Sequence, residues 1–259
     1  MKTIGIFPYL KKPRATEVSL ELANLLKKSG FKVVMEDKIA NQLGKEDWGL
    51  KKEGLLNSID LGIVLGGDGA LLYLARLLYP REIPIFGINL GRLGFLTEVE
   101  DKDLDGKSIG NLVGLNDIVI NKGASSRMLR LEILIDQYLT ATMPADGLII
   151  STPTGSTAYS LSAGGSILDP QLSALILTPI CAHSFFTRPL VVGSKSTIEV
   201  KFTELANEAI LTADGQEGIR LETDDVIKIF TAPHFTKFVR FKEKSFYNIL
   251  REKIKQGRL

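Results

Sequence analysis

An aspartate lies in a glycine-rich turn between two apolar segments, and these residue types could carry out chemistry on phosphates. The turn Gly66–Gly69 reads Gly-Gly-Asp-Gly, the run Leu61–Leu65 precedes it, and Ala70–Leu78 follows it. The first run predicts a short buried strand, and the second, built mostly from strong helix formers, predicts a helix. Glycines at a helix start leave N–H groups free and let a phosphate approach the main chain. An acid facing phosphates is unfavourable without a metal ion or a hydroxyl to deprotonate, so Asp68 suggests phosphoryl transfer.

The segment Asn89–Leu96 follows the next predicted strand and carries a cation and an aromatic ring. Arg92 could contact a phosphate, and Phe95 could supply a stacking face. An interdomain linker that places Phe95 in the core explains the same residues. The glycine turn has a structural alternative as well, a tight connection in which Asp68 only caps the helix.

The pair Asn116-Asp117 lies directly before a predicted strand, where Asn and Asp ordinarily form turns. An adjacent amide and carboxylate could also bind the two hydroxyls of a ribose. The local sequence leaves both interpretations open.

A second dense polar segment extends from Asp146 to Ser162. The predicted strand Gly147–Ile150 runs into a loop rich in Ser, Thr and Gly, and a short helix is predicted near Gly155. Free N–H groups and hydroxyls suit the polar edges of a base, and Tyr159 can stack on it. A cluster of helix caps is the alternative, although caps alone leave many small polar side chains unexplained.

The overall composition limits the classes of function. The 259 residues include 32 basic and 30 acidic side chains, so the charge requires neither a nucleic acid polymer nor an anionic membrane as partner. Cys181 is the single cysteine, which excludes an intrachain disulfide, and a conventional structural zinc site is not expected. The N-terminal apolar run is too short for a signal peptide and no segment fits a membrane span, so we expect a cytoplasmic protein.

The elements expected around these motifs fall into two domains. Strand and helix patterns alternate up to Ile88, which predicts an α/β domain at 1–95 with a mostly parallel sheet. Short strand-like runs separated by turn residues follow and predict an antiparallel, sandwich-like all-β domain at 96–239. Helical spacing returns over Lys242–Lys255. We expect this C-terminal helix to return to the first domain, which then also includes 240–259, or to pack against a partner subunit.

Taken together, these segments resemble the NAD kinase family, which shares a Gly-Gly-Asp-Gly kinase superfamily with diacylglycerol and sphingosine kinases. The matching segments occur in family order: Gly66–Gly69, Asn89–Leu96, Asn116-Asp117, Asp146–Ser162 with Gly164-Gly165, Pro179–Pro189 and Ala213–Gln216. The glycine turn alone is specific only to the superfamily. The continuous run from Asp146 to Ser160 is specific to NAD kinases.

The resemblance implies transfer of the γ-phosphoryl group of ATP to the 2′-hydroxyl of the adenosine ribose of NAD, which gives NADP. By position, Asp68 looks like the catalytic group that polarises or deprotonates this hydroxyl. The substrate-binding residues that the resemblance implies are Gly67 and Gly69 for the diphosphate, Asn116 and Asp117 for ribose hydroxyls and adenine, Asp146 for the nicotinamide carboxamide, Thr157, Ala158, Tyr159 and Ser162 for the base, and Phe95 and Gln216 as walls. Gly66 and Arg92 are further candidate phosphate contacts.

The family depends on a divalent cation, so Mg²⁺ is expected beside ATP, with Asp68 as the one candidate protein ligand. The family also forms dimers or tetramers. The chain departs from its pattern in three places. Ala70 stands where Thr or Asn is common, Asp117 stands where Glu is usual, and Cys181-Ala182 occupies a segment that often has a proline before His183. Two alternatives remain, a lipid kinase of the same superfamily, which needs an apolar acceptor channel, and a non-catalytic NAD or nucleotide sensor, which could dispense with Asp68.

Overall fold

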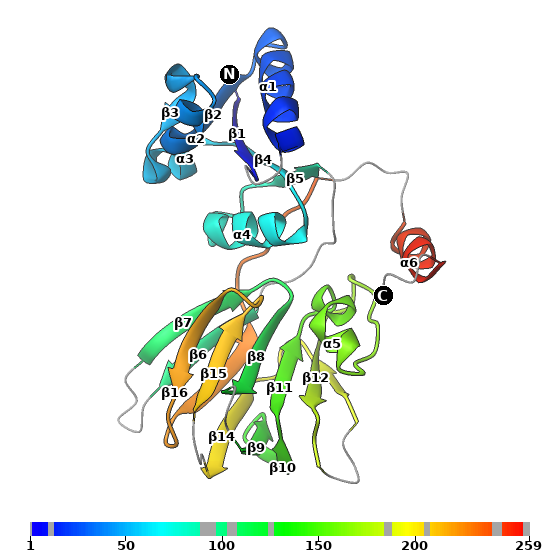
Figure 1. Cartoon of the computed structure of the whole chain (residues 1–259). Coiled ribbons are helices and arrows are strands. Elements are labelled where there is room, and N and C mark those ends of the chain that lie inside the picture. The colour runs from blue at the N-terminus through cyan, green and yellow to red at the C-terminus, as the bar shows by residue number, and fades with distance from the viewer. Residues whose placement is uncertain are drawn as a thin grey trace. The chain divides into compact units, whose positions relative to one another are not determined.

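The computed structural model divides the chain into two compact units (Figure 1). The described residues are 2–9, 13–88, 97–102, 108–123, 127–183, 188–204, 208–239 and 245–255. One unit comprises Met1–Leu93 and His234–Glu243, and the other comprises Gly94–Pro233 and Lys244–Leu259. Each unit has its own sheet or sheets and its own core, and each is described by itself.

The first unit is a parallel sheet with connecting helices, as the alternating sequence pattern predicts. Its described strands are ordered β3-β2-β1-β4-β5, and every pair is parallel. The strands are β1 (Thr3–Pro8), β2 (Lys32–Glu36), β3 (Gly49–Leu50), β4 (Leu61–Leu65) and β5 (Ile85–Ile88). The helices are α1 (Pro13–Lys28), α2 (Asp37–Gln42), the 3-10 turn η1 (Glu46–Trp48), α3 (Lys52–Ser58) and α4 (Asp68–Leu78).

The direction in which strands are added to this sheet reverses between β1 and β4. Strand β2 pairs with one side of β1 and β4 pairs with the other. The pairing continues past the strand ends, because the Tyr9 N–H donates to the Leu65 carbonyl at 2.8 Å. Ligands of open parallel sheets bind beyond the carboxyl ends of the strands at such a reversal. The turn Gly66–Gly69 begins at this point.

The second unit contains two antiparallel sheets, as predicted from its short strand-like runs. In the described residues the strand orders are β10-β9-β14-β17-β6-β7 and β13-β12-β11-β8-β15-β16. The first sheet has β6 (Thr97–Lys102), β7 (Ser108–Gly114), β9 (Leu129–Ile135), β10 (Tyr138–Ala145), β14 (Ile198–Glu204) and β17 (Val226–Thr231). The second has β8 (Asp117–Lys122), β11 (Gly147–Ser151), β12 (Ala174–Ile180), β13 (Leu190–Gly193), β15 (Ala209–Ala213) and β16 (Glu217–Leu221). Between β11 and β12 lie η2 (Gly155–Thr157) and α5 (Tyr159–Ser162).

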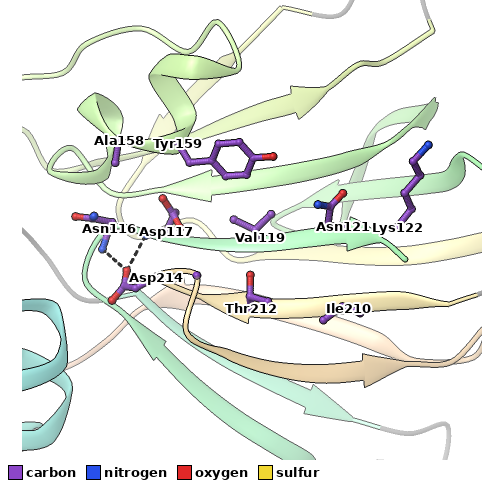
Figure 2. Close-up of a pocket in the computed structure, with 11 residues that line it drawn as sticks. Asn116, Asp117, Val119, Asn121, Lys122, Ala158, Tyr159, Ile210, Thr212 and Asp214 are labelled. Carbon is purple, nitrogen blue, oxygen red and sulfur yellow. Dashed lines mark hydrogen bonds between the residues drawn. The ribbon is translucent and has the colours of Figure 1, made fainter. Parts of the chain in front are cut away.

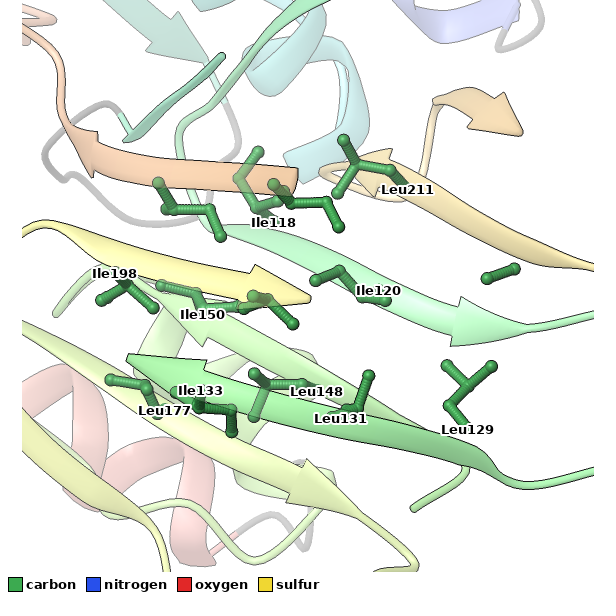
Figure 3. Close-up of a cluster of buried hydrophobic side chains, with 14 of the residues drawn as sticks. Ile118, Ile120, Leu129, Leu131, Ile133, Leu148, Ile150, Leu177, Ile198 and Leu211 are labelled. Atoms are coloured by element: carbon green, nitrogen blue, oxygen red, sulfur yellow. The ribbon is translucent and has the colours of Figure 1, made fainter. Parts of the chain in front are cut away.

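One apolar core lies between the two sheets of the second unit and makes them a sandwich (Figure 3). Alternate residues of several strands enter it, for example Leu129, Leu131 and Ile133 of β9 and Ile118 and Ile120 of β8. This period of two follows from the pleat of a strand, which turns successive side chains to opposite faces. The other face of β8, which carries Asp117, Val119 and Asn121, therefore does not enter this core.

The C-terminal segment differs from our expectation. The stretch before the final helix returns to the first unit, where it pairs with Ile85 of the edge strand β5. The Ile85 carbonyl accepts a hydrogen bond from the Val239 N–H at 2.8 Å, and the Ile85 N–H donates to the Lys237 carbonyl at 2.7 Å. Helix α6 (Phe246–Lys255) belongs to the second unit, and the Tyr247 hydroxyl donates to Asp169 at 2.7 Å. An edge strand has unpaired backbone groups that an extended segment satisfies better than a helix does. In the described ranges, no helix has the length and apolar character needed to cross a membrane.

Candidate functional site

The glycine turn opens the first helix after the sheet reversal. Gly67 occupies the N-cap position of α4 in an extended conformation, with no side-chain cap, and Asp68 is the first helical residue. The interpretation of Asp68 as a helix cap is therefore wrong, and its side chain is exposed. A β-carbon at Gly67 or Gly69 would meet no atom within 4 Å, so the space in front of this backbone is open. The first helical N–H groups can bind an anion here.

Gly66 has a different role, because a side chain has no room at this position. A β-carbon there would lie 2.7 Å from the Ala70 Cβ and 3.1 Å from the Tyr9 Cβ. Gly66 thus lets α4 start close against the end of β1. Gly66 is therefore needed for close packing of the helix, whereas Gly67 and Gly69 leave the backbone accessible to a ligand.

A pocket with a polar end lies in the second unit, on the face of β8 and β15 that does not enter the core (Figure 2). Its cavity volume is about 420 Å³. The lining residues are Asn116, Asp117, Val119, Asn121, Lys122, Ala158, Tyr159, Ile210, Thr212, Asp214 and Gly215. A cavity of this size is in the range of small-molecule sites.

The turn that carries Asn116 and Asp117 is held from its N–H side by Asp214. The Asp214 carboxylate accepts backbone hydrogen bonds from Leu115 at 2.9 Å, from Asn116 at 2.7 Å and from Asp117 at 3.2 Å. Two of these bonds are drawn in Figure 2. The Asp214 N–H donates in return to the Asp117 carbonyl at 3.0 Å. Charged acceptors make such bonds stronger than neutral ones.

The carbonyl side of the same turn is held by the loop that follows β11. The Thr152 N–H donates to the Asn116 carbonyl at 2.9 Å, and the Thr152 hydroxyl donates to the Leu115 carbonyl at 2.8 Å. The backbone of Gly155 packs against Asn116 so closely that a β-carbon there would overlap the Asn116 carbonyl oxygen. The two polar segments found in the sequence therefore meet in space at their main chains.

Asp117 is a buried acid beside a second acid. It is only 4% exposed. Burial, and to a lesser degree the negative charge of Asp214, raise the pKa of Asp117 to about 7. Both causes disfavour the charged carboxylate. Asp117 therefore takes up and releases a proton near neutral pH, which is unusual for an aspartic acid.

The predicted base-binding residues divide into two groups. Ala158 and Tyr159 line the pocket together with Asp117 and Val119 (Figure 2). Thr157 and Ser162 do not line it, and the Thr157 hydroxyl donates to the Thr154 carbonyl at 3.2 Å. Gln216 lies in the exposed turn between β15 and β16, next to the pocket residue Gly215.

The buried hydroxyls of this polar loop are used inside the protein and not on the pocket wall. Ser156 donates to the Pro153 carbonyl and accepts the Leu168 N–H, and the Ser160 and Thr178 hydroxyls bond to each other at 2.8 Å. Our expectation that these hydroxyls suit the edges of a base therefore does not hold for the buried ones. Ser156 and Ser160 do not cap a helix either, because η2 and α5 have no side-chain cap hydrogen bond. Each has the hydrogen-bond partner that a buried hydroxyl requires.

Asp146 forms an ion pair at the opposite end of β8. Its carboxylate lies 2.8 Å from the Lys122 ammonium, with both side chains partly exposed. Lys122 lines the pocket, whereas Asp146 reaches it only through this partner. Arg92 and Phe95 lie outside the described residues. Within the described part of the chain, no group of three acidic, histidine or cysteine side chains could hold a metal ion.

Sequence reasoning did not select several pocket residues, although a signal for them exists. Asp117, Val119 and Asn121 alternate with the core residues Ile118 and Ile120. The same period of two places Ile210, Thr212 and Asp214 on the pocket face of the neighbouring strand and turn. Once one pocket residue of a strand is known, taking every second residue along that strand predicts its other pocket residues.

The fold and these two sites define a two-unit protein suited to binding a nucleotide. The model of the ATP-NAD kinase N-terminal domain matches residues 4–108, and that of the C-terminal domain matches residues 115–241. An NAD kinase of Moorella thermoacetica is 44% identical over 99% of this chain and 90% of its own length. One of Geobacter sp. strain M21 is 40% identical over 99% of both chains. The chain belongs to the NAD kinase family.

Solved structures of this family share the fold. A crystal structure of yeast NADH kinase in complex with NADH superposes with a TM-score of 0.89 and 24% identity, over 98% of this chain and 88% of that chain. A crystal structure of an NAD kinase from Archaeoglobus fulgidus in complex with ATP gives a TM-score of 0.74 and 24% identity, over 97% of this chain and 98% of that chain. The two-unit arrangement of parallel and antiparallel sheets is thus the fold of the family.

Proposed function

We propose that this chain transfers the γ-phosphoryl group of ATP to the 2′-hydroxyl of the adenosine ribose of NAD and so forms NADP. Membership of the NAD kinase family over nearly the whole chain is the observation that carries this proposal. The open glycine turn and the pocket with a polar end support it independently, because one suits phosphates and the other a nucleoside.

The proposed roles follow the chemistry of the side chains. Asp68 accepts the proton of the 2′-hydroxyl while the oxygen attacks the γ-phosphorus and ADP leaves. Gly67 and Gly69 donate backbone N–H groups to phosphate oxygens, and Gly66 and Arg92 assist there. Asn116 and Asp117 bind ribose hydroxyls and adenine.

The remaining substrate contacts are proposals of the same kind. Tyr159 and Ala158 form the wall for a base, and Thr157, Ser162, Phe95 and Gln216 complete its surroundings. Asp146 binds the nicotinamide carboxamide at the end of the pocket where it pairs with Lys122. We also propose that the protein is a homodimer or homotetramer, which light scattering after size-exclusion chromatography tests.

A divalent ion, most simply Mg²⁺, fits the donor set at the glycine turn. Mg²⁺ is commonly held by one or two carboxylates together with substrate phosphates, so a cluster of protein ligands is not needed. The exposed Asp68 carboxylate beside open backbone N–H groups is such a donor. When bound, the ion would neutralise charge on the transferred phosphoryl group. The protein itself contributes mainly positioning and one proton acceptor.

The test incubates the purified protein with ATP, Mg²⁺ and NAD and measures NADP with an NADP-specific dehydrogenase. NADP formation that requires both ATP and NAD is expected. Binding of NAD without NADP would instead support the nucleotide sensor. Phosphorylation of diacylglycerol in place of NAD would support the lipid kinase.

A further inference from the structure

We propose that Asp214 is a positioning residue of the nucleotide site, whose carboxylate fixes the main chain of Leu115–Asp117 so that Asn116 and Asp117 present their side chains to the pocket. The inference deepens the proposed function and depends on it only for the identity of the nucleotide. Asp214 lies in the segment Ala213–Gln216, which matches the family pattern, but the sequence alone indicates no role for it.

The geometry makes Asp214 the organising group of this turn. One carboxylate accepts three successive backbone N–H groups at 2.7–3.2 Å. Because the Asp214 N–H also donates to the Asp117 carbonyl, the two segments are bound in both directions. An asparagine side chain has a single acceptor oxygen and no charge, so it can reproduce only part of this arrangement.

The backbone of Asp214 allows a clean substitution. Its φ is +51°, in the left-handed region, and asparagine tolerates this region better than most residues do. Asp136 offers a matched control, because its φ is also +51° and its carboxylate also accepts a backbone N–H, from Thr197 at 2.9 Å. Asp136 lies in the exposed hairpin between β9 and β10 and does not line the pocket.

The charge of Asp214 also acts on Asp117, and this gives a second readout. The titratable residues that line the pocket with Asp117 are Lys122 from β8, Tyr159 from α5 and Asp214. Lys122 is paired with Asp146 at the far end of the strand. The negative charge of Asp214 raises the pKa of Asp117, in addition to the larger effect of burial. Loss of this charge therefore moves the titration of Asp117 to lower pH.

The experiment compares Asp214→Asn with Asp136→Asn and wild type in the NADP-forming assay from about pH 5.5 to 8.5. In Asp214→Asn, we expect KM for NAD to rise about tenfold or more, because charge-assisted bonds to the turn are lost. We expect kcat to change by less than about threefold, since the glycine turn is untouched. The midpoint of the pH dependence of KM should lie near 7 in wild type and in Asp136→Asn, and lower in Asp214→Asn.

A rise in KM no larger than that of Asp136→Asn, or an unmoved pH midpoint, would overturn the inference. If Asp214→Asn does not fold, Asp214→Glu decides the question, since it keeps the charge but displaces the acceptor; KM should rise while the midpoint stays near 7. If wild type forms no NADP, the proposed function fails. Calorimetric titration with NAD then tests the inference alone, and equal affinities of wild type and Asp214→Asn would refute it.

Discussion

Replacement of Asp117 by asparagine is expected to stabilise the protein at alkaline pH and to make its stability less dependent on pH. The reference pKa of the carboxyl is 3.8, and in the folded protein it is about 7. Between these values the folded state binds more protons than the unfolded state. Stability therefore decreases as the pH rises through this window, and below the reference pKa the group has no effect.

The size of the effect follows from the same two pKa values. A difference of about three units corresponds to about 4 kcal/mol of lost stability once the pH is well above the folded pKa. From about pH 5.5 to 8.5, only the folded state still releases this proton, and wild type should lose about 2 kcal/mol relative to Asp117→Asn. Groups distant from position 117 titrate equally in both proteins and cancel in the difference.

Urea unfolding of both proteins at these two pH values measures this difference in the free energy of unfolding. Asp136→Asn serves as the control for simple loss of a negative charge, because its side chain is exposed. A stability difference between Asp117→Asn and wild type that is the same at both pH values would refute the reasoning. Binding of NAD by Asp117→Asn should be weaker than that of wild type, since an amide cannot replace a carboxylate as acceptor for two hydroxyls.

Three further substitutions test the remaining parts of the proposal. Asp68→Asn should lower kcat by at least about 10²-fold with little change in NAD binding, and near wild-type turnover would remove Asp68 from the chemistry. Gly155→Ala should lower the free energy of unfolding by about 1–3 kcal/mol, because the added β-carbon would meet the Asn116 carbonyl. The control Gly193→Ala has open space around the added β-carbon and should not lower it, so equal shifts of the thermal midpoint in the two variants would contradict the reasoning. Tyr159→Ala should weaken NAD binding in calorimetry by about fivefold or more, and an unchanged affinity would exclude a stacking role.

The parallel unit could be predicted well from the sequence because its signals are local. The strand predicted at Leu61–Leu65 and the helix predicted at Ala70–Leu78 agree closely with β4 and α4. Uninterrupted apolar runs, glycine stops and helix formers determine these elements within a few residues of each other. The same alternation of strands and helices predicts that the glycine turn lies at the carboxyl edge of the parallel sheet.

Our strand prediction did not include five strands of the sandwich, which are β6, β7, β12, β13 and β16. In two of them, β6 and β12, the sequence itself argues against a strand. Strand β6 reads Thr-Glu-Val-Glu-Asp-Lys, with charges that strands usually avoid, and its pairing with β17 outweighs this preference. Strand β12 contains Pro179, which normally argues against a strand. Strand β13 pairs only with Ala174–Leu177, so Pro179 lies beyond that pairing and its missing N–H breaks no bond with β13.

The candidate site could be predicted in its parts but not in its connections. Asn116-Asp117 and the segment after Asp146 were both selected, yet nothing local indicates that Thr152 and Gly155 support the Asn116 main chain. Asp214 lies about one hundred residues from the turn that it holds, as its hydrogen bond to Asn116 spans 98 positions. Contacts over such separations come from sheet pairing, which a single sequence does not specify.

A buried aspartate next to a second aspartate is a costly arrangement, and its cost argues for a role in binding. Asparagine at position 117 would keep most hydrogen bonds of the turn without the desolvation of a charge or the repulsion by Asp214. It would lack the second acceptor and the negative charge that a pair of ribose hydroxyls favours. Groups that reduce stability yet line a pocket are characteristic of functional sites. The pair Asp117 and Asp214 is therefore best explained by one acid that contacts the nucleotide and a second that holds the first in place.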